Sequence, residues 1–372
     1  MRAPAGQRLI VRELSDAIAA LPELALLDPQ HLDDADILIC VLGFEDRCLA
    51  VPQALVGAGV RARSVVVCRY LTNRSENAIN DPDLAKCLGK IMPGTPHQLD
   101  ADSGDFGSQL RNLVARYASD KEATRVYLDA SVASNALIIR ALAALLDLDI
   151  DLHVLYAEAE NYRPTQDEYE TSRADPEMAE RGQLAHGVLD VTVASEFPGR
   201  HAVALPHRII IFPGFDRDRV RAAISQVDND FIMEPFQAPL VWMIGRPLHD
   251  ADAWRQAALI NLHGVPPHHE RHTVSTFDYR ETMYALEDVH QCFGLQSNLS
   301  VVPLGSKMQA VAVALFCLAR KEVAVVVSQP REYHAVAYSA GARALWHLPL
   351  GRTADISRSL QMVDTVHLEP LE

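Results

Sequence analysis

The segment VYLDASVASNALIIRALAALL, residues 126–146, places a strand directly before a helix. β-Branched and aromatic residues lead to Asp129, and after Ser134 the apolar residues are those of a buried helix. An open α/β sheet holds its ligands at such junctions, beyond the carboxyl ends of its parallel strands. Asp129, Ser131, Ser134 and Asn135 therefore have three interpretations: they do chemistry, they hold a ligand, or they cap the helix.

The same alternation of strands and helices runs along most of the chain. It predicts an α/β fold with mainly parallel sheets. The expected strands are 35–44, 62–70, 124–130, 151–158, 207–215, 239–245, 298–305 and 322–329. The expected helices are 105–120, 134–148, 277–294 and 306–321.

The two sets of elements have the same order, and the sequence itself repeats. ILICVLGFEDRCLAVPQAL (37–55) parallels RIIIFPGFDRDRVRAAISQV (208–227), with Gly43 and Gly214 separated by 171 residues. Phe106 and Phe277 have the same separation, as do Tyr162 and Tyr333, and Ser134 matches Ser306 with a slip of one. A repeat this long predicts two tandem Rossmann-like domains that form a pseudo-dimer. We expect the first in residues 1–200 (core about 35–165) and the second in residues 201–372 (core about 207–335).

Two segments connect the halves. Residues 161–183 are polar and charged, which predicts a loop or a solvated helix. Residues 184–206 carry one more possible strand and a connection that contains Pro and Gly.

Composition limits the possible functions. The chain has 34 basic and 49 acidic residues, a formal charge of −15, which disfavours extended DNA duplexes but leaves room for a local pocket for a small anion. The six cysteines have no paired metal spacing, and several lie in apolar runs, as expected of reduced thiols. No apolar run is long enough for a membrane span, and the first residues lack the apolar core of a signal peptide. We therefore expect a cytoplasmic protein without membrane contacts.

Candidate site residues follow the first strand of each half. The turns GFEDR (43–47) and GFDRDR (214–219) share a glycine, an acid and arginines. The glycine permits a positive φ or a close approach to a ligand, and arginine offers a planar set of donors to phosphate. Alternatively, the acids favour a helix N-terminus and the arginines are merely exposed. The candidates for ligand binding are Gly43, Phe44, Arg47, Gly214, Arg217 and Arg219.

A second pair of turns, DASVASN (129–135) and PLGSKMQ (303–309), occupies matching places in the two halves. Small hydroxylated residues before a helix leave backbone N–H groups free for an anion, or serve only as N-caps. Lys307 is unfavourable in a first helical turn unless an anion is present. This adds Ser131, Ser134, Asn135, Gly305, Ser306 and Lys307 to the ligand-binding candidates, with Asp129 and Glu45 as the candidates for catalysis.

Several familiar sites are not predicted. Neither half contains a dinucleotide fingerprint or a P-loop, and the ASVAS segment is not a nucleophile elbow. The histidines of LHGVPPHHERH (262–272) lie in a Pro-rich segment without a Cys or a clear carboxylate ligand, which favours a polar surface loop over a zinc site. We expect no cofactor and no metal.

These turns resemble those of CARF-like domains, the CRISPR-associated Rossmann-fold sensors of cyclic oligoadenylates. In that family two Rossmann-like units pair about a two-fold axis, and the ligand lies over the turn after the first strand and a small-residue turn after the fourth. PLGSKMQ is similar to the latter turn, with DASVASN at its equivalent place in the first half. The first half departs from the pattern through Asn135 in place of a lysine and through Asp129. No effector nuclease segment is recognisable, so the resemblance implies a sensor that acts through a partner protein or degrades its ligand.

Three functions remain open. The first is a sensor in prokaryotic antiviral defence that holds a nucleotide or short cyclic oligonucleotide between its halves, with a possible effector protein as partner. The second is a hydrolase or transferase that acts on a nucleotide or phosphorylated substrate with Asp129 and Glu45. The third is a non-catalytic scaffold subunit of a larger complex. The sensor hypothesis requires that Arg47, Arg217 and Lys307 converge on one cleft.

Overall fold

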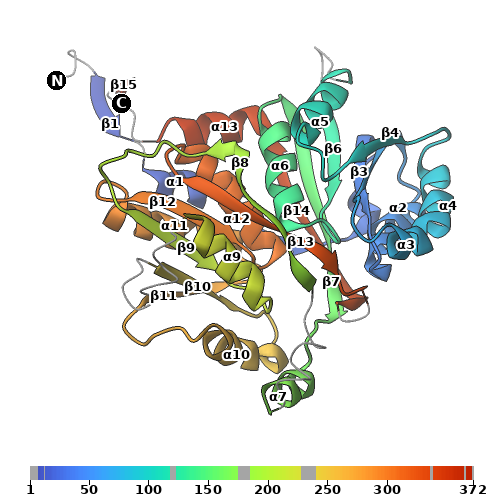
Figure 1. Cartoon of the computed structure of the whole chain (residues 1–372). Helices are drawn as coiled ribbons and strands as arrows, with labels where there is room; N and C mark the ends of the chain where they lie inside the picture. Colours follow the sequence, from blue (N-terminus) through green and yellow to red (C-terminus); the bar gives the residue numbers. More distant parts are fainter. Residues whose placement is uncertain are drawn as a thin grey trace.

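The computed structural model describes residues 7–11, 13–117, 123–174, 185–227, 240–335, 338–363 and 366–370. Within these residues the chain forms two mostly parallel sheets with helices packed against them, an α/β fold with two Rossmann-like halves. In Figure 1, β3, β4 and α2–α4 lie on one side of the molecule and β9–β11 with α9 and α10 on the other. A separate antiparallel pair joins the two ends of the described chain, β1 (Gln7–Val11) and β15 (Val366–Pro370).

The first sheet has the strand order β2-β14-β7-β6-β3-β4-β5. The five strands from β7 to β5 are parallel, and β14 pairs antiparallel with both β7 and β2. The strands are β2 (Ala25–Leu26), β3 (Ala35–Leu42), β4 (Ala62–Arg69), β5 (His97–Asp100), β6 (Thr124–Asp129), β7 (Ile150–Asn161) and β14 (Ala340–Arg352).

The second sheet has the order β11-β10-β9-β12-β13-β8, with only β8 antiparallel. It therefore repeats the order β5-β4-β3-β6-β7 of the first sheet strand for strand. The strands are β8 (Ala185–Pro198), β9 (His207–Phe212), β10 (Leu240–Arg246), β11 (Glu270–Ser275), β12 (Asn298–Pro303) and β13 (Ala324–Tyr333).

The two halves exchange their last strands. β8 follows β7 in the chain but pairs with β13 of the second sheet, and β14 follows β13 but pairs with β7 of the first. Each half thus completes the sheet of the other. The division into residues 1–200 and 201–372 stays a prediction, since each part contributes a strand across it.

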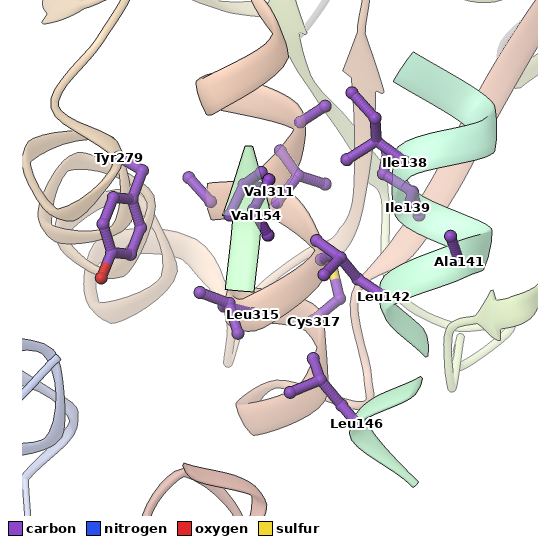
Figure 2. Close-up of a cluster of buried hydrophobic side chains, with 14 of the residues drawn as sticks. Ile138, Ile139, Ala141, Leu142, Leu146, Val154, Tyr279, Val311, Leu315 and Cys317 are labelled. Atoms are coloured by element: carbon purple, nitrogen blue, oxygen red, sulfur yellow. The ribbon is translucent and has the colours of Figure 1, made fainter. Parts of the chain in front are cut away.

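The helices cover both sheets and join them in a common core. α6 (Asn135–Leu146) packs against α12 (Lys307–Ala319), and one buried apolar cluster contains residues of both halves. Figure 2 shows Ile138 and Leu142 of α6 pointing toward α12, whose Cys317 lies on the facing side. The other main helices are α1 (Leu14–Ala19), α2 (Ala50–Ala58), α3 (Arg74–Asn77), α4 (Asp81–Ile91), α5 (Phe106–Ala115), α7 (Gln166–Ala174), α9 (Arg217–Val227), α10 (Trp254–His263), α11 (Tyr279–Phe293) and α13 (Thr353–Gln361).

Every predicted strand corresponds to an observed one, and the four predicted helices correspond to α5, α6, α11 and α12. Residues 118–120 of the predicted helix 105–120 lie outside the described residues, as does residue 239 of one strand. The polar segment 161–183 contains α7, and its residues 175–183 are also outside the described range. Four cysteines, Cys40, Cys48, Cys68 and Cys317, are buried free thiols, and within the described ranges no helix has the length and apolarity to cross a bilayer.

Candidate ligand-binding site between the halves

Two arginines, Arg47 and Arg219, hold positions at the boundary of the halves that the repeat relates with a slip of one. Arg47, in the short 3₁₀ turn η2 (Asp46–Leu49), donates from Nη1 to the Ala157 carbonyl of β7 at 3.0 Å. Arg219 of α9 donates to the Ser328 carbonyl of β13 in the same way. Since Ala157 and Ser328 are 171 residues apart, the repeat extends to these contacts.

Two cavities flank this boundary. The first cavity, of about 460 Å³, lies at the ends of β4–β6 and is closed by β13 and Arg219 of the second half. The second cavity, of about 250 Å³, lies at the ends of β9–β12 and is closed by β7 and Arg47 of the first half. Leu304, Gly305, Lys307 and Tyr338 line both, so the cavities meet there. A small cavity of about 40 Å³, lined by Gly43, Phe44 and Glu45, also reaches Lys307 and Tyr338.

Lys307 lies where the three cavities meet. Its side chain is half-buried at the first residue of α12 and has no hydrogen-bond or ion-pair partner in the described part of the chain. Loss of solvation and the charges of Arg47 and Arg219 together lower the pKa of Lys307 to about 8, whereas Glu45 acts in the opposite sense. A partnerless ammonium group close to two arginines is suited to bind an anion.

The arginines themselves differ in their neighbours. Arg47 is 3% exposed and forms an ion pair with Glu45 at 2.9 Å, and Glu45 also accepts a hydrogen bond from Ser339. Arg219 forms no ion pair within the described residues; it lies over the Tyr333 ring with its guanidinium 5.9 Å from the ring centre, and its buried Nε atom has no hydrogen-bond partner. Arg219 can therefore still donate a hydrogen bond from Nε to a ligand.

Arg217 does not join these cations. It is exposed at the first residue of α9 and lines neither cavity. The expected convergence of Arg47, Arg217 and Lys307 is therefore wrong for Arg217. Side chains two residues apart on a helix are rotated by about 200° around the helix axis and so face nearly opposite sides. Arg219 consequently faces the cavity and Arg217 faces solvent, so the cluster of cations that the sensor hypothesis requires is formed by Arg47, Arg219 and Lys307 instead.

The serines before the two helices are N-caps. Ser134 accepts from the Leu137 N–H at 3.1 Å, and Ser306 accepts from the Gln309 N–H at 3.2 Å within a complete capping box. Asn135 uses its side chain to join the halves, because its Nδ2 donates to the carbonyls of Pro303 at 2.9 Å and Gly305 at 2.8 Å. Ser134 and Asn135 line the first cavity, and Ser306 lines the second.

The glycines of these turns are required by packing rather than by a positive φ. Neither Gly43, Gly214 nor Gly305 has a positive φ. A Cβ at Gly214 would lie 2.7 Å from the Leu304 carbonyl oxygen, and a Cβ at Gly43 would lie 3.1 Å from the Val132 side chain. The first-strand turn of the second half is thus pressed against the turn that carries Lys307.

Asp129 and Ser131 are engaged with each other below the site. Asp129 is 2% exposed and accepts hydrogen bonds from both the N–H and the hydroxyl of Ser131, whose Oγ accepts from the Ala157 N–H at 2.8 Å. Burial raises the pKa of Asp129 to about 6, against the lowering by these hydrogen bonds and by Arg47. Neither residue lines the two cavities. Both side chains instead hydrogen-bond within the turn and do not face the cavities.

Aromatic side chains line the cavities and were missed as site residues. Tyr70, Tyr333 and Tyr338 line the first cavity, while Tyr156, Tyr162, Phe215 and Phe277 line the second. The matches of Tyr162 with Tyr333 and of Phe106 with Phe277 were the available signal. They pointed to the repeat but not to the cavity, because an aromatic residue after a strand is equally suited to packing.

A buried acid–histidine pair also lines the second cavity. Glu158 of β7 is 1% exposed, and it accepts from the Trp346 Nε1 at 3.0 Å while His249 lies 2.5 Å from its other oxygen. The three residues come from the first half, from the exchanged strand β14 and from the second half. No local sequence pattern links residues so far apart in the chain.

The histidines of 262–272 have separate protein partners. His263 Nε2 lies 2.8 Å from the Gly214 carbonyl, and burial lowers its pKa to about 4. His269 accepts from Trp242 at 3.3 Å, and His272 lies 3.0 Å from Glu270. Within the described ranges no group of His, Cys, Asp and Glu is arranged to hold a metal ion.

No family model matches the chain, and no curated protein matches it. Among solved structures it is similar to a type III CRISPR defence DNA nuclease activated by cyclic oligoadenylate, with 10% identity, a TM-score of 0.45, and coverage of 82% of this chain and 67% of that one. It is also similar to the cytoplasmic domain of a prokaryotic cation chloride cotransporter, with 7% identity, a TM-score of 0.23, and coverage of 82% and 99%. At these values the two likenesses carry no argument about the chemistry of this chain.

Proposed function

We propose that the protein is a sensor that binds a nucleotide or short cyclic oligonucleotide between its two halves. The observation that supports this most directly is Lys307, a half-buried cation without a partner at the meeting point of the cavities. The chain carries a formal charge of −15, yet three cations and one carboxylate gather here. Placing like charges together where solvation is reduced is costly, and a bound phosphate would offset that cost.

The surroundings support a nucleotide over inorganic phosphate. Both cavities exceed the size of a phosphate, and aromatic rings line them where a base can stack. The resemblance of the two turn pairs to CARF-like domains adds the ligand class, cyclic oligoadenylate, and a role in prokaryotic antiviral defence. A sensor of this kind passes its signal to an effector protein.

Thermal unfolding and titration calorimetry with mononucleotides and cyclic oligoadenylates test this proposal. We expect a ligand to raise the melting temperature of the wild type without being consumed. Lys307→Met should weaken binding about 10- to 100-fold, as for the loss of one charge-assisted hydrogen bond. Lys321→Met removes an exposed lysine beyond the C-terminal end of α12 and is the matched control, with unchanged binding expected. Equal affinity of Lys307→Met and wild type would contradict the proposal.

A second candidate, a hydrolase or transferase acting on the bound nucleotide, is favoured by the Glu158–His249 pair. A histidine oriented by a buried carboxylate is a common general base, and His249 lines the same cavity as Lys307. Chromatography of the ligand after incubation distinguishes the candidates. An enzyme forms product that His249→Gln abolishes while binding persists; a sensor returns the ligand unchanged.

A further inference from the structure

The two cavities are related by the repeat but are chemically unequal. At the start of α6 and α12, the repeat matches Asn135 with Lys307. The amide of Asn135 is used by the carbonyls of Pro303 and Gly305, whereas the ammonium of Lys307 has no partner in the part of the chain that the structure describes. Of the two equivalent side chains, Asn135 therefore has its amide donors in use, and Lys307 has its ammonium group available for a ligand.

The same inequality holds for the arginines. Each arginine that lines the second cavity has a carboxylate partner, Arg47 with Glu45, Arg163 with Glu168 and Arg255 with Asp252, and the buried Glu158 also lies on the wall of that cavity. At the first cavity Arg140 pairs with Glu196, whereas Arg219 has no ion pair within the described residues; the carboxylates of Asp102 and Asp190 also line this cavity. The cations without a carboxylate partner are thus Lys307 and Arg219, on the side of Lys307 that faces the first cavity.

Tyrosines line both cavities, but the phenylalanine rings are distributed in the opposite sense. Phe215 and Phe277 line the second cavity. Their repeat partners do not line the first: Phe106 is fully buried, and the Phe44 ring packs against Tyr338 with the ring centres 5.6 Å apart. Apolar surface for a ring is therefore offered by the second cavity.

We infer that the ligand has no two-fold axis, with an anionic group between Lys307 and Arg219 and an aromatic ring in the second cavity between Phe215 and Phe277. This rests on the proposed ligand-binding function and specifies which ligands it takes. A two-fold symmetric ligand presents equal groups to both cavities, and one of its phosphates would lie in the second cavity, where Glu158 lines the wall and each lining arginine already has a carboxylate partner. Repulsion and loss of solvation at that phosphate disfavour such ligands.

Calorimetry with four adenylates tests the inference. AMP and cyclic triadenylate have no two-fold axis; cyclic diadenylate and cyclic tetraadenylate have one. We expect one of the first two to bind at least about tenfold tighter than either of the others, at one molecule per chain. Ribose 5-phosphate, which lacks the base, should bind more weakly than AMP.

Arg219→Gln is the test variant, and Lys321→Gln is its control. Arg219→Gln should weaken AMP about tenfold or more and leave adenosine, which has no phosphate, unchanged. Tighter or equal binding of the two-fold symmetric ligands overturns the inference and leaves the proposed function in place. Absence of binding by all four adenylates overturns both.

Discussion

At Lys307 three unfavourable terms act on one ammonium group. The first turn of α12 directs the positive end of the helix dipole toward it, neighbouring groups reduce its solvation, and Arg47 and Arg219 add like charge. All three effects favour the neutral amine, and the reduced solvation together with the charges of Arg47 and Arg219 lowers the pKa of Lys307 to about 8. An anion reverses all three, so affinity and protonation are linked at this residue.

We therefore expect anion affinity to fall as the pH rises through about 8, the pKa of Lys307. The lysine is charged below that value and neutral above it, and a phosphate monoester with a second pKa near 6 is already fully ionised there. Titrations of AMP between pH 7 and pH 10 measure the effect. Lys307→Met should bind weakly at every pH, and an equal decline in that variant would assign the decline to another group.

The stability of the ligand-free protein should respond in the opposite sense. Between about pH 8 and the ordinary lysine value near 10.5, the unfolded chain binds the proton that folded Lys307 has lost. The free energy of unfolding consequently rises with pH over that window through this group. Urea unfolding of wild type and Lys307→Met at pH 7.5 and pH 9.5 isolates the contribution as the difference between the two.

Residue identity alone did not settle which side chains reach the site. The turn GFDRDR contains two arginines, and only the helical phase at the start of α9 decides that Arg219 faces inward and Arg217 outward. Asp129 was equally ambiguous, because a strand-end acid satisfied by a neighbouring serine has the same sequence as one that faces a ligand. Whether a side chain faces the site depends on where a helix or turn begins to within one or two residues, and hydrophobic periodicity does not locate that point so closely.

At the scale of elements, the N-caps of α6 and α12 offer a matched comparison. Ser134→Ala and Ser306→Ala each remove one cap, which costs about 1 kcal/mol of stability. Ser306 also donates to the Thr276 carbonyl at 2.6 Å and shares a capping box with Gln309, so its loss should cost more. Urea unfolding of both variants measures the order, and a smaller cost for Ser306→Ala would contradict it.

The buried strands and the amphipathic helices were predictable, because β-branched runs and helical spacing mark them. The short edge strands β5 (HQLD) and β11 (ERHTVS) were not, since half-exposed polar strands lack an apolar pattern. β14 was missed for a related reason: its sequence AGARALWHLPLGR contains Pro, Gly and Arg, and its burial comes from pairing with β7.

At the scale of the whole molecule, the exchange of β8 and β14 makes the halves interdependent. Sequence order places β8 beside β7 and β14 beside β13, and no local feature reports that each crosses to the other sheet. The crossing brings Ser339 to Glu45 and Trp346 to Glu158, so the exchange also builds the walls of the site. The shared core between α6 and α12 also makes the stability of each half depend on the other, because neither helix buries its apolar face alone.

Expression of residues 1–200 and 201–372 as separate chains tests this interdependence. The first fragment lacks β14 and exposes the face of α6 that packs on α12; the second lacks β8 and exposes the reverse face. We expect neither fragment to unfold cooperatively in urea, and the two coexpressed fragments to form a complex that does. A fragment that unfolds cooperatively by itself would show that its sheet is stable without the exchanged strand. The halves would then be separate folding units that only share a ligand site.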